Sequence, residues 1–321
     1  MRVLSADDVR AALPMIDAID AMREAFVALS SGRSTVPIRT VMLTPDGVTL
    51  VMPALLHGAP ISTVKVVSVN PTNPRRGLPA VVATVLVLDA QTGQPLAMLD
   101  GTSLTAIRTG AASGLATDLL ARKDASVLGV IGAGAQARTQ IEAVCAVRTI
   151  RQIRVYSPHH AAQLADDLRP VYDAEIVVAP NAHAALMGTD IIVTATNSKT
   201  PVVSLADVAP GTHINGVGSF TPHMQEIAAD VVTKAKIVVD HRPSAWEEAG
   251  DLIVPRDQGL ITEDDVHAEL GEIAAGTRPG RERDDEITFF KSVGNAVQDA
   301  AAAWRVLDAA QKRNLGVIVP F

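Results

Sequence analysis

Residues 126–137 read Ser-Val-Leu-Gly-Val-Ile-Gly-Ala-Gly-Ala-Gln-Ala, and they decide the fold of the second part of the chain. An apolar run that suits a buried strand leads directly into Gly-x-Gly-x-x-Ala, and a helical pattern follows to about Val147. Gly132 permits the tight turn, Gly134 leaves room for a pyrophosphate, and Ala137 lets the helix pack on the strand. The helix N-terminus offers free N–H groups to phosphates. The stretch therefore predicts a dinucleotide-binding turn, and the alternative is a strand–helix turn without a ligand.

Downstream of this turn, short apolar strands alternate with helices or loops. The expected strands are residues 153–156, 175–178, 190–195, 213–217 and 236–240. Such alternation is typical of a doubly wound parallel sheet with right-handed crossovers. We therefore predict a Rossmann domain and assign it residues 119–299.

Upstream of the turn, predicted strands follow one another without helices between them. They are residues 48–56, 61–69, 80–88 and 95–99, with helices expected at 14–30 and 104–121. Strands at such short intervals imply a mostly antiparallel sheet, so this part is an α+β domain. A long helix at 294–312 and a strand at 316–319 end the chain, and the whole is an α/β protein of two domains.

The composition limits the class of protein. The chain has 321 residues, of which 48% are hydrophobic and 20% charged, and its net charge is −7. These values predict a soluble globular protein and argue against nucleic acid as a partner. The start lacks a signal-peptide pattern, no apolar run reaches membrane-spanning length, and the single Cys145 fits a reducing cytoplasm. The eight histidines form no His-Glu-x-x-His pair and there is no cysteine cluster, so we expect no metal.

The end of the second Rossmann strand indicates which dinucleotide binds. An NAD enzyme usually has Asp or Glu there to hold the ribose hydroxyls. This chain has Tyr156-Ser157-Pro158-His159-His160 instead. Because a carboxylate would repel a 2′-phosphate and these side chains tolerate one, NADP(H) is favoured, with NAD(H) as the alternative. The two histidines are equally well explained as solvated residues that start a helix.

Several further motifs resemble the ornithine cyclodeaminase/mu-crystallin family. They are Val64-Lys65-Val66, Gly77-Leu78-Pro79, Leu88-Asp89 with Thr92-Gly93, Leu104-Thr105-Ala106-Ile107-Arg108-Thr109-Gly110-Ala111, and Ser292-Val293-Gly294-Asn295-Ala296 followed by Gln298-Asp299. Their order and spacing match from about Pro37 to the C-terminus. The Leu-Thr-x-x-Arg-Thr-Gly-Ala stretch is the most specific of them.

The resemblance implies a homodimer that binds an α-amino or α-imino acid between its two domains. The substrate-binding and dimerisation domain would be discontinuous, with residues 1–118 and 300–321. Arg39, Lys65 and Arg108 match the family's substrate-binding cations. The resemblance and the dinucleotide motif together place these residues at the cofactor: Thr109, Gly132, Gly134, Ala135, Gln136, Ala137, Ser157, His159, Thr194, Ala195, Thr196, Val217, Val293 and Gly294.

The chemistry of the three cations agrees with such a site. The planar fork of Arg108 suits a substrate carboxylate, and Arg39 can add a second contact. Lys65 lies in an apolar strand near positive neighbours, so we expect a lowered pKa and a catalytic acid–base role. The alternatives are a lysine that reaches solvent along its aliphatic stem and arginines in ordinary salt bridges. Asp240 and Asp299 also match the family, and we interpret both as structural hydrogen-bonding residues.

Two positions depart from the cyclodeaminase pattern. Phe220 replaces an Asp that handles the amine during ring closure, and Ala80 replaces a substrate-contacting Thr. Both changes remove polar groups, so a second amine would be poorly satisfied. We therefore expect a ketimine reductase that acts on Δ1-pyrroline-2-carboxylate or Δ1-piperideine-2-carboxylate.

Three other functions stay open at this point. An alanine-dehydrogenase-like enzyme would use the same cations on a linear keto acid and ammonia. A cyclodeaminase would release ammonia from ornithine. A crystallin-like protein would bind NADPH without turnover.

Overall fold

A computed structural model describes residues 1–320, so Phe321, the last residue of the expected C-terminal segment, lies outside it. The chain divides into two compact units, Met1–Arg108 with Asn295–Phe321, and Thr109–Gly294. These boundaries come earlier than those expected after residues 118 and 299. The first falls inside helix α3 (Gly101–Leu120), because an added Cβ at Gly110 would lie 2.4 Å from the Thr139 carbonyl oxygen of the second unit. The second falls before Asn295, the N-cap residue of helix α11 (Ala296–Arg313).

The first unit is built on one sheet. Its strand order is β16-β1-β7-β6-β5-β4-β2, with β3 paired to β4, and every pair except β1–β7 is antiparallel. The predicted, mostly antiparallel sheet is therefore confirmed, although β1, β2 and β3 were not expected. The elements are β1 (Arg2–Leu4), β2 (Ser34–Thr35), β3 (Thr40–Thr44), β4 (Gly47–Leu56), β5 (Ile61–Val69), β6 (Val81–Asp89), β7 (Pro95–Asp100), β16 (Val317–Ile318), α1 (Ala6–Ala12) and α2 (Met15–Ser30), with α11.

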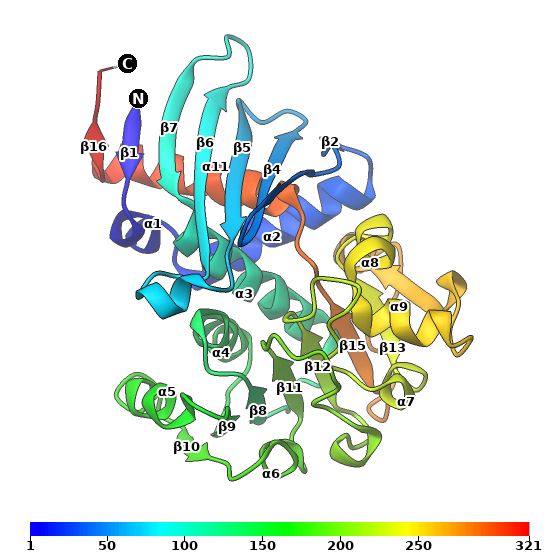
Figure 1. The fold of residues 1–321 in the computed structure, drawn as a ribbon. Coiled ribbons are helices and arrows are strands. Elements are labelled where there is room, and N and C mark those ends of the chain that lie inside the picture. The colour runs from blue at the N-terminus through cyan, green and yellow to red at the C-terminus, as the bar shows by residue number, and fades with distance from the viewer. Residues whose placement is uncertain (321) are drawn as a thin grey trace. The chain divides into compact units, whose positions relative to one another are not determined.

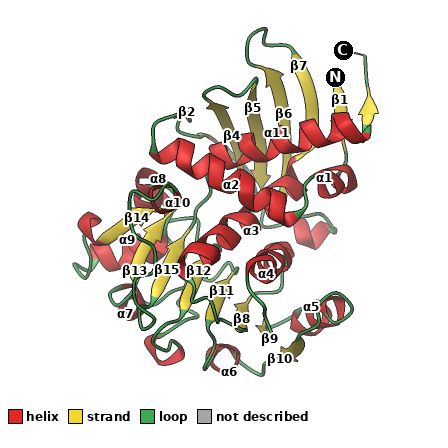
Figure 2. Cartoon of the chain, turned by 180° about the vertical axis from the view of Figure 1, so that it is seen from behind, coloured by secondary structure: helices red, strands yellow, loops and turns green. Residues whose placement is uncertain are grey.

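Helix α11 covers one face of this sheet, as Figures 1 and 2 show from opposite sides. Met52 and Val67 of the sheet pack with Ala296 and Ala300 of the helix in one buried cluster. Small alanine side chains let the helix approach the strands closely. The first turn of α11 is therefore held directly against the middle of β4 and β5.

The second unit contains a parallel sheet with the strand order β10-β9-β8-β11-β12-β15-β13-β14. This confirms the predicted Rossmann fold (Figure 1). Two strands, β14 and β15, were not expected, and β15 enters the middle of the sheet between β12 and β13. The elements are β8 (Val127–Ile131), β9 (Gln152–Tyr156), β10 (Glu175–Val178), β11 (Ile191–Thr194), β12 (His213–Gly216), β13 (Lys236–Val239), β14 (Val266–Glu269), β15 (Thr288–Lys291), α4 (Ala135–Val147), α5 (Ala161–Leu168), α6 (Ala182–Leu186), α7 (Ala229–Val232), α8 (Arg242–Glu248), α9 (Gly250–Asp257) and α10 (Leu270–Ala274).

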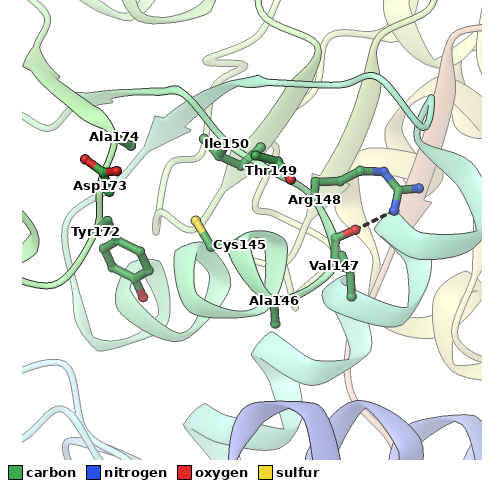
Figure 3. Close-up of a pocket in the computed structure, with 9 residues that line it drawn as sticks. All are labelled: Cys145, Ala146, Val147, Arg148, Thr149, Ile150, Tyr172, Asp173 and Ala174. Atoms are coloured by element: carbon green, nitrogen blue, oxygen red, sulfur yellow. Dashed lines mark hydrogen bonds between the residues drawn. The ribbon is translucent and has the colours of Figure 1, made fainter.

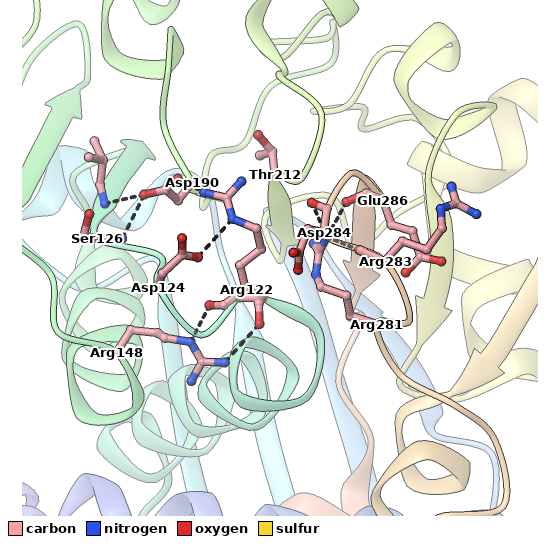
Figure 4. A network of polar contacts seen from close by, with 12 residues as sticks. Arg122, Asp124, Ser126, Arg148, Asp190, Thr212, Arg281, Arg283, Asp284 and Glu286 are labelled. Atoms are coloured by element: carbon pink, nitrogen blue, oxygen red, sulfur yellow. Dashed lines mark hydrogen bonds and ion pairs between the residues drawn. The ribbon is translucent and has the colours of Figure 1, made fainter.

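A buried arginine caps the C-terminus of α3 within the second unit (Figure 4). The guanidinium of Arg148 donates to the carbonyl oxygens of Thr117, Ala121 and Arg122 at 2.9 to 3.1 Å. These carbonyls lie at the end of the helix, where a charged donor adds hydrogen bonds and interacts favourably with the negative end of the helix dipole. No helix within residues 1–320 is long and apolar enough to cross a membrane.

Candidate functional site

Lys65 points to the buried face of β5. Residues alternate along this strand, so Lys65 shares its face with Thr63 and Val67, and its neighbours on the adjacent strands are Met52 and Val85. The side chain is only 2% exposed. The alternative in which Lys65 reaches solvent is therefore wrong.

The Asp299 carboxylate joins two of the predicted cations. Lys65 Nζ lies 2.7 Å from Asp299 Oδ2, and Arg108 Nε donates to Asp299 Oδ1 at 3.1 Å. Arg108 Nη1 also donates to Gln298 Oε1 at 3.0 Å. All four side chains are buried. Arg108 thus forms a salt bridge, as the alternative interpretation expects, and the Asp299 carboxylate holds Arg108 and Lys65 side by side.

The start of α11 explains how Asp299 comes to this place. Asn295 is the N-cap residue and accepts from Val297 N, while Gln298 Oε1 accepts from Asn295 N at 2.8 Å, so the two form a capping box. Asp299 follows in the first helical turn, where a negative charge is favoured by the helix dipole. The sequence motif includes both residues, but it predicts only a structural role for Asp299 and no role for Gln298.

The electrostatics of Lys65 follow from this arrangement. Burial lowers its pKa to about 8, the carboxylate of Asp299 opposes this effect, and the positive charges of Arg108 and Arg39 add to it. The direction is the one expected from the sequence. Half-buried Arg39 lies just before β3, within electrostatic reach of Lys65. The Lys65 ammonium and the Arg108 guanidinium share the single Asp299 carboxylate, so this cluster of three side chains keeps a net positive charge that suits an anionic ligand.

The glycine-rich turn has the geometry that a dinucleotide needs. Gly132 has a φ of +111°, and an added Cβ would lie 2.5 Å from the Ala195 carbonyl oxygen, so only glycine fits. Gly134 is the N-cap residue of α4 without a side-chain hydrogen bond, and an added Cβ there would meet no atom within 4 Å. The fully buried Ala137 packs the helix onto the sheet. Open space in front of uncapped N–H groups is where phosphates fit.

The segment after β9 carries no carboxylate. Ser157 is half-buried, whereas His159 and His160 are exposed, with ring centroids 6.2 Å apart. His160 is the N-cap residue of α5. The histidines therefore begin a helix at the surface, as the simpler interpretation holds.

Other residues that the sequence predicts at the cofactor lie where the parallel strands end. Asp240 Oδ2 accepts hydrogen bonds from Ser292 Oγ, Val293 N and Gly294 N at 2.7 to 2.9 Å, which agrees with its interpretation as a structural residue. Thr194 and Thr196 both donate to Glu226. No local pattern in the sequence indicates Glu226, because its partners are distant in the chain.

A cavity of about 450 Å³ in the second unit lies away from these residues (Figure 3). Cys145, Arg148 and Tyr172 line it, and it contains none of the predicted site residues. Burial raises the pKa of Cys145 to about 12, which excludes a reactive thiolate at neutral pH. Among residues 1–320, no group of three His, Cys, Asp or Glu side chains is arranged to hold a metal ion.

The whole chain is similar to proteins of known function. A Δ1-pyrroline-2-carboxylate reductase of Bacillus cereus is 41% identical over 326 residues, covering all of both chains. The solved structure of the Thermococcus litoralis Δ1-pyrroline-2-carboxylate reductase in complex with NADH and L-proline matches with a TM-score of 0.96 and 42% identity, covering 99% of this chain and 100% of that one.

An archaeal alanine dehydrogenase dimer with bound NAD matches with a TM-score of 0.94 and 37% identity, over 100% of this chain and 99% of that one. The model of the ornithine cyclodeaminase/mu-crystallin family matches residues 1–314. The resemblance inferred from the motifs is thereby confirmed. The chain belongs to the ornithine cyclodeaminase/mu-crystallin family.

Proposed function

We propose that this protein is an NAD(P)H-dependent reductase that converts Δ1-pyrroline-2-carboxylate, or its six-membered homologue Δ1-piperideine-2-carboxylate, to the cyclic L-amino acid. The buried cluster of Lys65, Asp299 and Arg108 is the observation that carries the proposal. It supplies positive charge for a carboxylate and a proton donor, Lys65, whose pKa burial lowers to about 8. The reductases among its relatives support the predicted class of oxidoreductase acting on C=N bonds.

In this reaction the two arginines bind the substrate, and Lys65 transfers the proton. Arg108 and Arg39 hold the substrate carboxylate. Asp299 fixes the position of the Lys65 ammonium and raises its pKa, which favours the protonated form. A dinucleotide held at the glycine-rich turn, Gly132 and Gly134, would supply the hydride that the carbon of the C=N bond needs. Lys65 gives one proton to the imine nitrogen, so that the C=N bond becomes CH–NH, and it regains a proton from water. Because burial disfavours the charged form of Lys65, the ammonium gives up its proton to the imine nitrogen more readily.

The substrate preference follows from the departures from the cyclodeaminase pattern. Phe220 and Ala80 remove polar groups that a diamino acid would need. A ring with one carboxylate leaves no second amine to satisfy. Alanine dehydrogenase activity is the second candidate, because the archaeal alanine dehydrogenase is 37% identical and the cation cluster suits its substrate as well.

Initial rates with three substrates test the proposal. The cyclic imines are expected to exceed pyruvate plus ammonia by roughly tenfold or more in kcat/KM, because the site holds a preformed ring without a separate amine. Ornithine with NAD should release no ammonia. Faster turnover of pyruvate would favour the dehydrogenase, and ammonia from ornithine would favour the lyase. Tight NADPH binding without turnover of any imine would indicate a binding protein.

We propose that NADP(H) is preferred and NAD(H) accepted. The support is the segment after β9, where Ser157 and His159 stand in place of an acidic residue. The same assay run with both cofactors tests this point, since kcat/KM should be higher with NADPH. A higher value with NADH would mean that the ribose is held by groups other than those at the end of β9.

We further propose a homodimer formed through the outer face of the first sheet. Val66, Val82 and Met98 are exposed on this face, which is opposite to Lys65. A large exposed apolar sheet face favours association with a second copy. Val82→Glu should convert the dimer to a monomer in light scattering, whereas the same substitution at Val171, a more exposed valine on the second unit, should leave the protein dimeric. A monomeric wild-type protein would contradict the proposal.

The remaining assignments concern compartment and partners. We propose a cytoplasmic enzyme, since a chain with one cysteine has no need of an oxidising compartment. Its partners are a small imino or amino acid and a second copy of the chain.

A further inference from the structure

The buried side chain of Glu226 takes part in neither the substrate cluster nor the glycine-rich turn. It is 0% exposed in the second unit. Its Oε1 accepts from Thr196 N at 2.6 Å, and its Oε2 accepts from Thr194 Oγ1, Gly218 N and Ser219 N at 2.8 to 3.1 Å. Four donors from two separate segments thus converge on one carboxylate.

The two segments are neighbouring strand ends at the carboxyl edge of the parallel sheet. Thr194 is the last residue of β11 and pairs in register with Gly216, the last residue of β12. An added Cβ at Gly218 would lie 2.2 Å from the Thr196 carbonyl oxygen and 2.4 Å from Glu226 Oε1. The loops therefore touch each other, and Glu226 fills the place where their N–H groups meet.

The backbone at Glu226 is in turn held by a buried ion pair, Asp251 with Lys291. Asp251 Oδ1 accepts from Glu226 N at 2.6 Å and from Ile227 N at 2.9 Å, and its Oδ2 lies 2.9 Å from Lys291 Nζ. Lys291 ends β15, directly before Ser292. Burial and the charge of Asp251 raise the pKa of Glu226, and Lys291 opposes them. The network thus continues from β11 and β12 to the end of β15.

These strand ends belong to one half of a dinucleotide site. In a doubly wound sheet the strands on one side of the first strand carry the adenosine half, and those on the other side carry the nicotinamide half. The end of β9 lies on the adenosine side of β8, whereas β11, β12 and β15 lie on the other side. The Glu226 carboxylate joins the ends of β11 and β12, and the Asp251–Lys291 pair links it to the end of β15, so this network acts on the nicotinamide half alone.

We propose that Glu226, supported by the Asp251–Lys291 ion pair, is a positioning residue that preforms the nicotinamide half of the cofactor site. It has no contact with the reacting atoms. It fixes the backbone at Thr196, Gly218 and Ser219, so that binding NAD(P)H does not have to order these loops.

Calorimetric titration with two ligands tests this role. Glu226→Gln keeps the size of the side chain but turns one acceptor into a donor that faces N–H groups. It should raise the Kd of NADH by roughly tenfold or more, because hydrogen bonds to a charged acceptor are strong. The Kd of ADP, which has only the adenosine half and the pyrophosphate, should be unchanged.

Asp190→Asn is the matched control. The Asp190 carboxylate also gathers two backbone N–H groups, those of Ser126 and Val127, but at the amino end of the sheet (Figure 4). It should lower the melting temperature without changing either Kd. If Glu226→Gln weakens ADP and NADH equally, or neither, the positioning role is overturned.

If Glu226→Gln does not fold, Thr194→Val carries the test with the same two ligands. It removes a single hydroxyl donor from a fully buried side chain. It should raise the Kd of NADH by about fivefold, since one hydrogen bond is lost, and leave that of ADP unchanged. An unchanged Kd of NADH overturns the proposal.

Discussion

Replacing Lys65 with methionine should slow the reduction of Δ1-pyrroline-2-carboxylate by about 10²- to 10⁴-fold, the range of a lost general acid. Methionine fits the apolar surroundings formed by Met52 and Val85, and Asp299 keeps its contact with Arg108. The fold should therefore persist. Because Lys65 belongs to the first unit and the glycine-rich turn to the second, the Kd of NADPH should change little. Stopped-flow turnover and a fluorescence titration with NADPH measure the two effects.

Lys236→Met provides the control for this substitution. Lys236 is also largely buried and paired with carboxylates, those of Glu282 and Glu286, but none of these residues belongs to the predicted site. It should cost stability without a comparable loss of kcat. If Lys65→Met turns over at close to the wild-type rate, Lys65 does not supply the proton.

Replacing Asp299 with asparagine should move the alkaline limb of the kcat/KM profile to lower pH. Lys65 donates only when protonated, so wild-type activity should fall as the pH rises through about 8. Asp299 is the group that raises the pKa of Lys65 against burial and the two arginines. Without its charge the pKa of Lys65 falls further, and a fall of about one pH unit lowers the rate at a fixed alkaline pH by about tenfold. Activity should recover toward the wild-type value as the pH is lowered.

Asp308→Asn, on the same helix α11, is the control for this profile. Asp308 pairs with Lys312 at the surface, so its loss should leave the limb in place. The position of the limb separates a positioning role from a loss of folded protein, because unfolding lowers the rate at every pH alike. If the alkaline limb of Asp299→Asn stays at the wild-type pH, the limb reports the titration of a group other than Lys65.

Much of the fold follows from local patterns. The predicted strands at 61–69 and 175–178 match β5 and β10, because alternating or continuous apolar residues bounded by Pro and Gly act over a few residues. The order of the strands in the sheet, by contrast, does not follow from local patterns. The strand β15, Thr-Phe-Phe-Lys, lies between β12 and β13, and its position depends on pairing with strands far away in the chain.

The candidate site divides in the same way. By itself, the sequence determined the turn at Gly132 and Gly134, since positive φ and open space at a helix N-terminus are local requirements. It also singled out Lys65 and Arg108 as cations in a specific pattern.

Only the tertiary structure decided what these cations contact. Asp299 reaches Lys65 and Arg108 because α11 returns to the first sheet from the far end of the chain. Glu226 likewise acquires its role only where β11 and β12 end side by side. Burial and pairing set the pKa and charge of these groups, and both arise from contacts between residues that are distant in sequence.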